Sequence, residues 1–445
     1  MRAGEEVPDM RVEPSPERSG EVNGSVRAVK CPFGGGGSDR DDRLLHASQF
    51  TVRTGSIQQD PDSGEWFVSD PRLARQVLRE TTARQAGFES DQVNEMGGQR
   101  SLLFLTGLEH RQQRTKAARF FTPKAVREKY EPLMRRETDR ALAAVRRGEV
   151  PLDAVAMEYS VAVARQIVGL TEAPLHRLAA RMQAFFGQTS SPGRLRQQLY
   201  RSKQLINLSS FYLLDVWPAI RARRAKPQDD VVSHLLAEGY GNAAITVECL
   251  TYAAAGMVTT REFISLCAWH LLRDQDLRAR YLAGDQAQRR RLLTEILRLE
   301  PIVRGLSRDL VTDLEVMVDG RPQTLPAGSR IRILLPEANT HPAVAGACPY
   351  AIESGRKVAE KFPDDVLAFG AGPHRCPGGA VAIQETDVLL YQLLQLPVRL
   401  VGEPKIGMDP LIASVTLRGL RIRVDDAAGT QAPAGSVDAS VPGMG

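Results

Sequence analysis

The feature that most constrains this chain is the segment 369–378, Phe-Gly-Ala-Gly-Pro-His-Arg-Cys-Pro-Gly, in which one cysteine stands among glycines and prolines. An apolar stretch of helical periodicity, residues 380–396, follows it directly. This order predicts a tight loop that presents the thiol of Cys376 at the N-terminus of a helix. The helix dipole and free backbone N–H groups there are expected to lower the thiol pKa, which suits a metal-bound thiolate. The alternative is a buried free cysteine beside a glycine-rich turn.

The composition is that of a globular protein. The 445 residues are 42% hydrophobic and 25% charged, and 58 Lys and Arg face 53 Asp and Glu, a formal net charge of +5. Because the two signs are interspersed, we expect no nucleic-acid binding and at most a local basic face for an acidic partner. The five cysteines form no CxxC pair, which excludes a Cys₄ zinc site, and their odd number argues against a secreted disulfide scaffold.

The chain is predicted to have one large body between two polar ends. Residues 1–40 are rich in Glu, Pro, Ser, Gly and Arg and predict a disordered arm, and residues 427–445 predict a disordered tail. No linker or repeat interrupts residues 41–426, which we interpret as a single large domain. We find no signal peptide and no apolar span of about 20 residues, so we expect a cytoplasmic protein without a membrane segment.

The body is predicted to be mainly α-helical with small β-sheets. Helical periodicity marks residues 71–78, 126–147, 152–169, 194–224 (as two helices with a junction) and 243–272. The last, ~45 Å long at ~1.5 Å per residue, has almost no charge before Arg261 and should cross the core. Residues 314–318 and 331–335 predict a hairpin with Asp319-Gly320 as its turn, and residues 415–424 predict a second small sheet.

The pattern F-x-x-G-x-x-x-C-x-G of the cysteine segment resembles the cysteine loop of the cytochrome P-450 (haem-thiolate monooxygenase) family. The resemblance covers roughly residues 41–426, with motifs in the family's order. It implies the cytochrome P-450 fold and haem b as cofactor, with Cys376 as the axial ligand of the iron. The other loop positions that match haem-binding residues are Phe369, Gly378 and His374, the last as partner of a haem propionate.

A Glu and an Arg three residues apart, Glu295 and Arg298, lie on a predicted helix. Taken alone, such a pair is an ordinary surface contact worth a few tenths of a kcal/mol. It resembles the family's E-x-x-R pair, which together with a later arginine holds the loop that carries the cysteine. The resemblance implies that Arg356 is that third residue.

Three further residues match positions where the family binds the haem propionates. His110 and Arg114 lie one helical turn apart, and Arg308 follows in a predicted strand. Each taken singly is more often a solvated residue. Within the resemblance they are expected to supply the cations and hydrogen-bond donors that two buried carboxylates need.

Small residues interrupt the long helix at 254–256. Gly inside a helix is ~1 kcal/mol worse than Ala, so either a close helix crossing or a function is expected. The resemblance implies that Ala255 and Gly256 leave a groove for dioxygen and that Thr259, with Thr260 beside it, hydrogen-bonds the oxygen ligand. Gly256, Thr259 and Thr260 are therefore the expected catalytic positions.

The family usually has an acid directly before this threonine, and this chain has Val258. A valine cannot donate a proton, so the proton would have to come from water, Thr260, the substrate or Glu262. Otherwise Val258 is simply a packing residue.

The function that the resemblance implies is monooxygenation of a lipophilic or natural-product-like small molecule. The chain has no G-x-G-x-x-G fingerprint after a strand and no room for a flavin domain, so NAD(P)H-derived electrons would come through a separate ferredoxin and ferredoxin reductase. A basic face that includes Arg375 would bind the ferredoxin. Substrate is expected under residues 87–107 and 194–224, in a pocket lined by Met96, Leu102, Leu103, Phe104, Ala254, Val303 and Leu306.

Three alternatives stay open. The first is oxidative coupling or peroxide-dependent oxidation on the same fold, suggested by Val258. The second is a non-catalytic haem protein or sensor. The third is a helical scaffold without haem. The sequence does not indicate the substrate.

Overall fold

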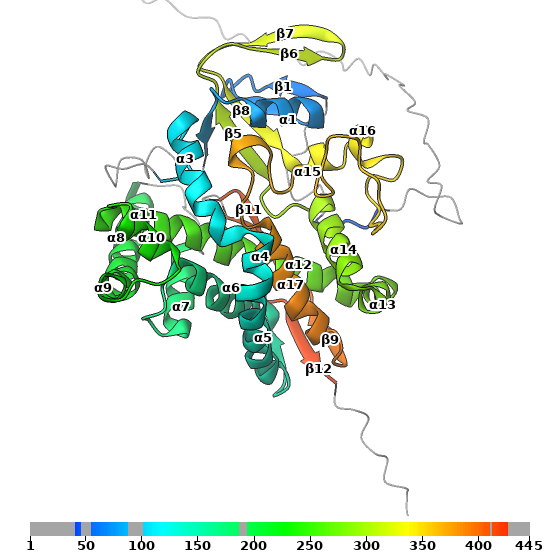
Figure 1. Cartoon of the computed structure of the whole chain (residues 1–445). Helices are drawn as coiled ribbons and strands as arrows, with labels where there is room; N and C mark the ends of the chain where they lie inside the picture. Colours follow the sequence, from blue (N-terminus) through cyan, green and yellow to red (C-terminus); the bar gives the residue numbers. More distant parts are fainter. Residues whose placement is uncertain (1–40, 46–54, 88–100, 187–193, 410–411, 426–445) are drawn as a thin grey trace, which may run out of the picture.

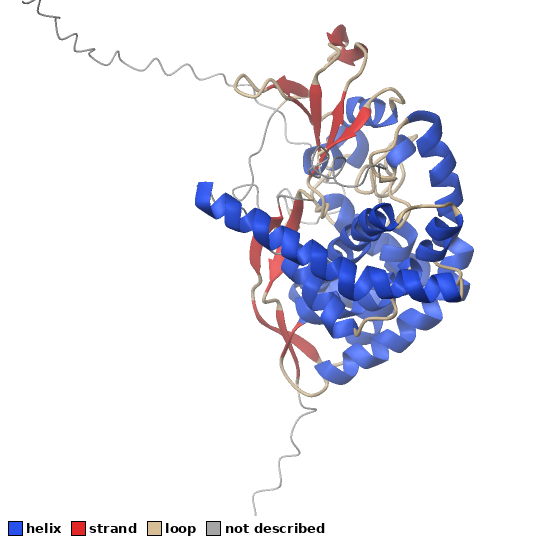
Figure 2. Cartoon of the chain, turned by 90° about the vertical axis from the view of Figure 1, so that its left-hand side faces the viewer, coloured by secondary structure: helices blue, strands red, loops and turns tan. Residues whose placement is uncertain are grey.

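The computed structural model describes residues 41–45, 55–87, 101–186, 194–409 and 412–425. The predicted disordered arm and tail, and Met96, lie outside these residues. Helices fill most of the molecule (Figure 1), and in the view of Figure 2 the strands lie at the top and down the left side. The expected class, mainly α with small sheets, is confirmed.

The described chain contains these helices: α1 (Pro71–Arg79), α3 (Gly107–Ala117), α4 (Pro123–Ala125), α5 (Glu131–Val145), α6 (Leu152–Val168), α7 (Leu175–Phe186), α8 (Arg194–Phe211), α9 (Trp217–Ala225), α10 (Val231–Ala237), α11 (Asn242–Ala253), α12 (Thr259–Arg273), α13 (Gln275–Ala283), α14 (Gln286–Leu299), α15 (Leu335–Asn339), α16 (Pro342–Ala345) and α17 (Gly379–Leu393). Short 3₁₀ turns, η2 (Ala118–Phe121) and η6 (Gly372–His374), and π-helical turns, η3 (Val126–Tyr130), η4 (Tyr212–Val216) and η5 (Ala254–Val258), join or flank them.

Local chemistry explains where several of these helices begin and end. The Asp70 carboxylate accepts hydrogen bonds from the N–H groups of Arg72 and Leu73 at the start of α1, and proline occupies the first turn. α6 ends at Gly169, whose φ of +98° is open to glycine at little cost. A side chain there would also collide with the carboxylate of Asp230, which caps α10.

The predicted central helix is observed as one run, α11–η5–α12, which extends from Asn242 to Arg273. Residues 260–272 are all buried, and α12 packs against α6. By length and composition alone this run is apolar enough to cross a membrane, as the core helix of a soluble protein can also be, although the sequence analysis did not count it as a span. Its position explains the composition, because a helix that is apolar on all sides must be surrounded by protein.

The two helices predicted within residues 194–224 form a single helical run, α8–η4–α9. The predicted junction is the π-helical turn η4, where one extra residue is accommodated without ending the helix. Pro218 follows at the start of α9, where the missing N–H is tolerated.

The largest sheet has the order β1-β2-β8-β5-β3. Its strands are β1 (Ile57–Gln59), β2 (Trp66–Val68), β8 (Arg330–Leu334), β5 (Gly305–Asp309) and β3 (Arg84–Ala86). The pair β2–β8 is parallel and the other pairs are antiparallel.

The predicted hairpin has a different second strand. β6 (Leu314–Val318) pairs across the Asp319-Gly320 turn with β7 (Arg321–Leu325), and residues 330–334 instead enter the large sheet as β8. The polar sequence of β7 and its Pro322 concealed it, because proline is tolerated only where a strand needs no N–H donor.

The predicted strand 415–424 is divided between two sheets. β11 (Ser414–Arg418) pairs with β10 (Lys405–Asp409), whereas β12 (Arg421–Val424) pairs with β9 (Val398–Gly402) and β4 (Val150–Pro151). Gly419, with φ of +73°, turns the chain between them.

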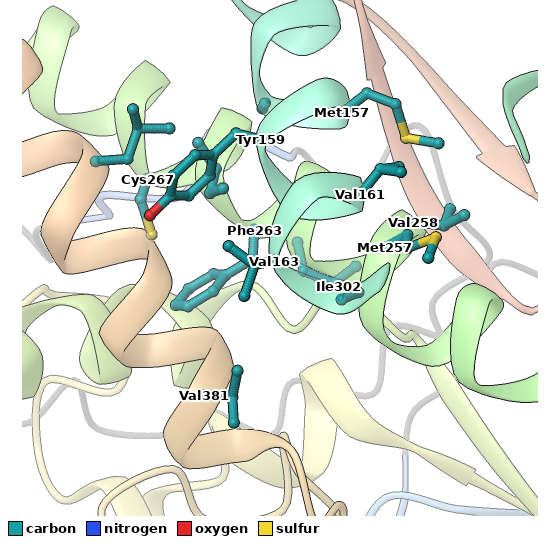
Figure 3. Packing of buried hydrophobic residues seen from close by; sticks show 14 of the residues in the cluster. Met157, Tyr159, Val161, Val163, Met257, Val258, Phe263, Cys267, Ile302 and Val381 are labelled. Carbon is teal, nitrogen blue, oxygen red and sulfur yellow. The ribbon is translucent and has the colours of Figure 1, made fainter. Parts of the chain in front are cut away.

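Two hydrophobic clusters form the core. The larger joins α5, α6, α12, α14 and α17, and Figure 3 shows part of it, including Met157, Phe263 and Val381. The smaller lies between α1 and the large sheet. The candidate site lies where residues of both clusters meet.

Candidate functional site

A cavity of about 1050 Å³ lies between the central helix and the cysteine loop. The predicted lining residues within the described chain all border it: Leu102, Leu103, Phe104, Ala254, Val303 and Leu306. Aromatic side chains from α7, η2, η4 and α11 add Phe185, Phe186, Phe121, Tyr212 and Tyr252 to its wall. A cavity of this size with mostly apolar walls can enclose a large lipophilic molecule.

The cysteine loop is a tight turn held against α1. The N–H of Cys376 donates to the Phe369 carbonyl at 2.8 Å. Gly370 and Gly372 have φ of +72° and +69°, and a side chain at Gly372 would overlap the backbone of Leu78. Only glycine combines this backbone conformation with this close approach, and the result is a rigid loop that presents Cys376.

The side chain of Cys376 borders the cavity three residues before the start of α17. Burial raises the pKa of its thiol, while the Gly378 N–H and the cations Arg114 and Arg375 act in the opposite direction. The direction is opposite to the expected lowering, because the surrounding protein atoms outweigh the donors, although the residue itself is exposed to the cavity. A bound metal ion would change that balance, since it replaces the thiol proton.

Four cationic or basic side chains meet at one edge of the cavity: His110, Arg114, Arg308 and His374. The rings of His110 and His374 stack with centroids 4.1 Å apart, and Arg114 donates to the Arg375 carbonyl. Arg308 is 2% exposed and donates to the Ser307 carbonyl at 2.9 Å. Within the described residues, none of the four forms an ion pair with an acid.

The electrostatics of this cluster are unfavourable without an anion. Burial lowers the pKa of Arg308 to about 10. Burial, and then repulsion from His110, Arg308 and Arg114, lowers the pKa of His374 to about 3. Buried cations are normally paired, so the cluster has the chemistry of a site for carboxylate or phosphate groups.

Glu295 and Arg298 are 4% and 0% exposed, which excludes the surface interpretation of this pair. Two hydrogen bonds of 2.7 and 2.9 Å join them. Arg356 donates to the same carboxylate at 2.5 Å. The structure therefore brings together the three residues that the resemblance groups, and the arginines also hold carbonyls of residues 339–351.

Arg375 lies differently from the expectation. It donates to the Asp365 carboxylate at 2.7 Å and to the Gly370 carbonyl at 2.8 Å, so its main contacts brace the cysteine loop. An arginine already paired in this way offers less charge to a docking partner.

The opposite wall of the cavity comes from the central helix, where Ala255, Gly256, Thr259 and Thr260 all border the space. The Thr259 hydroxyl donates to the Ala255 carbonyl at 2.6 Å. A side-chain carbon at Gly256 would lie 3.8 Å from Ala164, an ordinary contact. Helix packing therefore does not require the glycine, and its effect is to leave the cavity wall open.

Val258 and Glu262 do not border the cavity. Val258 is fully buried among core side chains (Figure 3). Both oxygens of Glu262 accept hydrogen bonds, from Arg261, Arg418 and the Leu417 N–H. The carboxylate that was considered as a proton source is thus held on the far side of the helix, and Val258 packs as a core residue.

Two carboxyl groups border the cavity that the sequence interpretation did not select, Glu248 on α11 and Glu385 on α17. Glu248 could have been found, because it is the only charged residue between Asn242 and Arg261. Glu385 had no comparable signal, since a second acid, Asp387, lies in the same helix.

The comparisons with known proteins agree with this geometry. The family model for Cytochrome P450 matches residues 290–396. Cytochrome P450 130 of Mycobacterium tuberculosis is 31% identical over 182 residues, 39% of this chain and 42% of that protein, so the match spans less than half of the relative. Putative cytochrome P450 138 of the same species is 26% identical over 361 residues, 74% of this chain and 78% of its own. The crystal structure of substrate-free CYP109E1 from Bacillus megaterium has a TM-score of 0.70 at 21% identity and covers 84% of this chain and 96% of that one.

Proposed function

This chain belongs to the cytochrome P450 family, and from that premise we propose that it is a haem-thiolate monooxygenase acting on a lipophilic small molecule. The observation that carries the proposal is that one thiol and a cationic cluster with no acid partner among the described residues lie together at the wall of a large cavity. When bound, haem b supplies the iron centre that activates dioxygen.

The donor set fits haem b in both charge and chemistry. Cys376 would be the axial ligand, with Phe369 and Gly378 beside it in the loop. The carboxylates of the haem would pair with the cluster of His110, Arg114, Arg308 and His374, which has no acid partner within the described residues. The two haem carboxylates would neutralise the positive charges of these buried side chains and accept hydrogen bonds from them.

On the substrate side the protein itself supplies a shaped apolar cavity that excludes water and the hydroxyl groups of two threonines. Apolar walls exclude water, which strengthens electrostatic interactions inside the site. Thr259 and Thr260 place hydroxyl groups at the wall where Gly256 leaves space. Because Val258 and Glu262 are directed away, a proton would reach Thr259 Oγ through water, Thr260 or a group on the substrate.

We propose that electrons come from NAD(P)H through a ferredoxin and its reductase. α1 packs against the cysteine loop with Arg79 next to Gly372, and Arg79, Arg72 on the same helix and Arg111 on α3 are exposed. These cations, more than the paired Arg375, support docking of an acidic ferredoxin. We assign the protein to the cytoplasm, with the apolar run 242–273 acting as the core helix.

The second candidate is oxidative coupling or peroxide-dependent oxidation, supported by the fact that neither Val258 nor Glu262 can deliver a proton to Thr259. Turnover under ¹⁸O₂ separates the possibilities. Haem-loaded protein is incubated with ferredoxin, reductase, NADPH and a panel of lipophilic probes that includes testosterone. A product that gains one ¹⁸O atom supports the monooxygenase. A product that loses two hydrogens without label supports coupling, and turnover with hydrogen peroxide alone supports the peroxide route. Haem without turnover of any probe would favour a sensor, and protein without haem would favour the scaffold.

A further inference from the structure

We propose that the wall of the cavity formed by α11 binds a protonated amine of the substrate through the carboxylate of Glu248. This inference rests on the proposed function and names the substrate class for that site: a lipophilic amine oxidised at a distance from its nitrogen. It follows from an acid that the fold places in the cavity wall and that has no counter-ion among the described residues.

Glu248 is 3% exposed and borders the cavity. One of its oxygens, Oε1, accepts a hydrogen bond of 2.6 Å from the N–H of Leu102, which fixes the carboxyl in place. The other oxygen, Oε2, is buried without a hydrogen-bond partner. A buried carboxylate oxygen without a donor is costly, and such groups in native structures call for an explanation.

No cation among the described residues pairs with Glu248. The groups around it are the hydroxyls of Ser101 and Thr251 and the side chains of Tyr240, Cys249 and Tyr252. Burial raises the pKa of each of the last three, so they are neutral near pH 7 and supply no positive charge. Burial likewise raises the pKa of Glu248 to about 7, and hydrogen bonds from the Leu102 N–H and the Ser101 hydroxyl offset this only in part, since neither carries a positive charge.

Gln204, Thr246 and Thr251 also border the cavity. Gln204 donates from Nε2 to the Phe185 carbonyl, and its Oε1 is buried without a partner. The hydroxyl donors of Thr246 and Thr251 are used on helix carbonyls. Within the described chain this wall therefore offers unused acceptors, and a ligand that supplies N–H donors and positive charge complements it.

The two ends of the cavity differ in sign. His110, Arg114, Arg308 and His374 lie at the edge near Cys376, whereas Glu248 precedes Gly256 by eight residues, ~12 Å along the helix axis at ~1.5 Å per residue. An amine at Glu248 would thus leave about that length of apolar chain to reach the groove at Gly256. Glu385, the other carboxyl at the cavity, lies on α17, the helix that follows the cysteine loop, and so at the opposite wall from α11.

The test is calorimetric titration of haem-loaded protein at pH 8 with two probes of the same shape. One is N,N-dimethyl-4-phenylbutylamine, which is protonated at this pH, and the other is its neutral isopropyl isostere. A hydrogen bond to a charged group predicts that the amine binds on the order of 10- to 100-fold more tightly. Glu248→Gln, which keeps an acceptor for Leu102, should reduce this preference to less than 3-fold.

Glu385→Gln is the matched control, since it replaces the other buried carboxyl of the cavity by an amide of the same shape, and it should keep the full preference. A wild-type protein that binds both probes equally overturns the proposal. A Glu248→Gln variant that keeps the preference, or a Glu385→Gln variant that loses it, overturns the assignment to Glu248.

Should Glu248→Gln fail to fold, the wild-type protein still decides the question. At pH 7 the amine, but not the isostere, should release a fraction of a proton from Glu248, seen as a binding enthalpy that changes with the ionisation enthalpy of the buffer. Equal buffer dependence for both probes contradicts the inference. A protein without the haem-thiolate spectrum defeats the proposed function instead, and that spectrum is recorded before any titration.

Discussion

Replacement of Glu295 by alanine should destabilise the protein by about 3–5 kcal/mol, because it leaves the buried Arg298 without a carboxylate and Arg356 with only a 3.7 Å contact to Glu353. The carboxylate accepts hydrogen bonds of 2.7 and 2.9 Å from Arg298, 2.5 Å from Arg356 and 3.3 Å from the Glu353 N–H. A hydrogen bond to a charged group contributes roughly 1.5–3 kcal/mol, but adding this value for every bond would overestimate the loss of stability. Both arginines keep backbone carbonyls as acceptors, so the value for a broken buried ion pair is the better one.

Urea unfolding followed by circular dichroism measures this loss as the change in midpoint multiplied by the slope. Glu137→Ala is the matched control, since Glu137 and Arg140 have the same i, i+3 spacing and a 2.6 Å contact, but Arg140 is 73% exposed. That change should cost no more than about 0.5 kcal/mol. Haem content should fall in Glu295→Ala alone. Equal, small losses in the two variants would refute the assignment of Glu295 to the brace of the cysteine loop.

Three further predictions concern single positions. The pKa of Glu248 is raised to about 7, so the wild-type protein loses stability as pH rises from about 4.5 to 7 and this carboxyl ionises. Glu248→Gln has no carboxyl to ionise at this position. In urea titrations the free energy of unfolding of the variant, relative to that of the wild type, should therefore increase by about 2–3 kcal/mol between pH 5 and pH 8. Val258→Asp should lose about 3 kcal/mol or more because it buries an unpaired acid, and a stable variant with faster NADPH use would show that Val258 faces the site after all. Gly372→Ala should lower the free energy of unfolding by at least about 2 kcal/mol and reduce haem content, because the new side chain meets the backbone of α1. Gly320→Ala is the control, since Gly320 also has a positive φ but open space around it, and this change should cost about 1 kcal/mol. Equal shifts of the melting temperature in the two variants would contradict the close approach of Gly372 to α1.

Local patterns predicted those elements whose own residues determine them. The cysteine loop has its glycines where φ is positive or the backbone of α1 is close, and the central helix has the length that its apolar run indicates. Spacing also placed Glu295 and Arg298 on one helical face. Their burial could not be predicted from spacing, because it depends on residues 339–356, which pack over them.

The errors come from contacts between distant segments. Strand β7 has little intrinsic strand character and forms because β6 is adjacent across a two-residue turn. Residues 415–424 alternate as one strand, but Gly419 divides them between two sheets. The π-helical turn η5 changes which residues face the cavity, so neighbours in sequence such as Val258 and Thr259 point in different directions. The direction of the Glu262 carboxylate, away from the cavity, likewise depends on a hydrogen bond from Arg418, which lies far away in the sequence.

The central claim is that Cys376 binds the iron of haem at the wall of this cavity. The direct measurement is the difference spectrum of the reduced carbonyl complex, recorded for the wild type and for Cys376→Ser. The account predicts a strongly red-shifted Soret band for the wild type and its loss in the variant, because only a thiolate ligand gives that shift. A colourless wild type, or a Cys376→Ser variant that keeps the band, would contradict the claim.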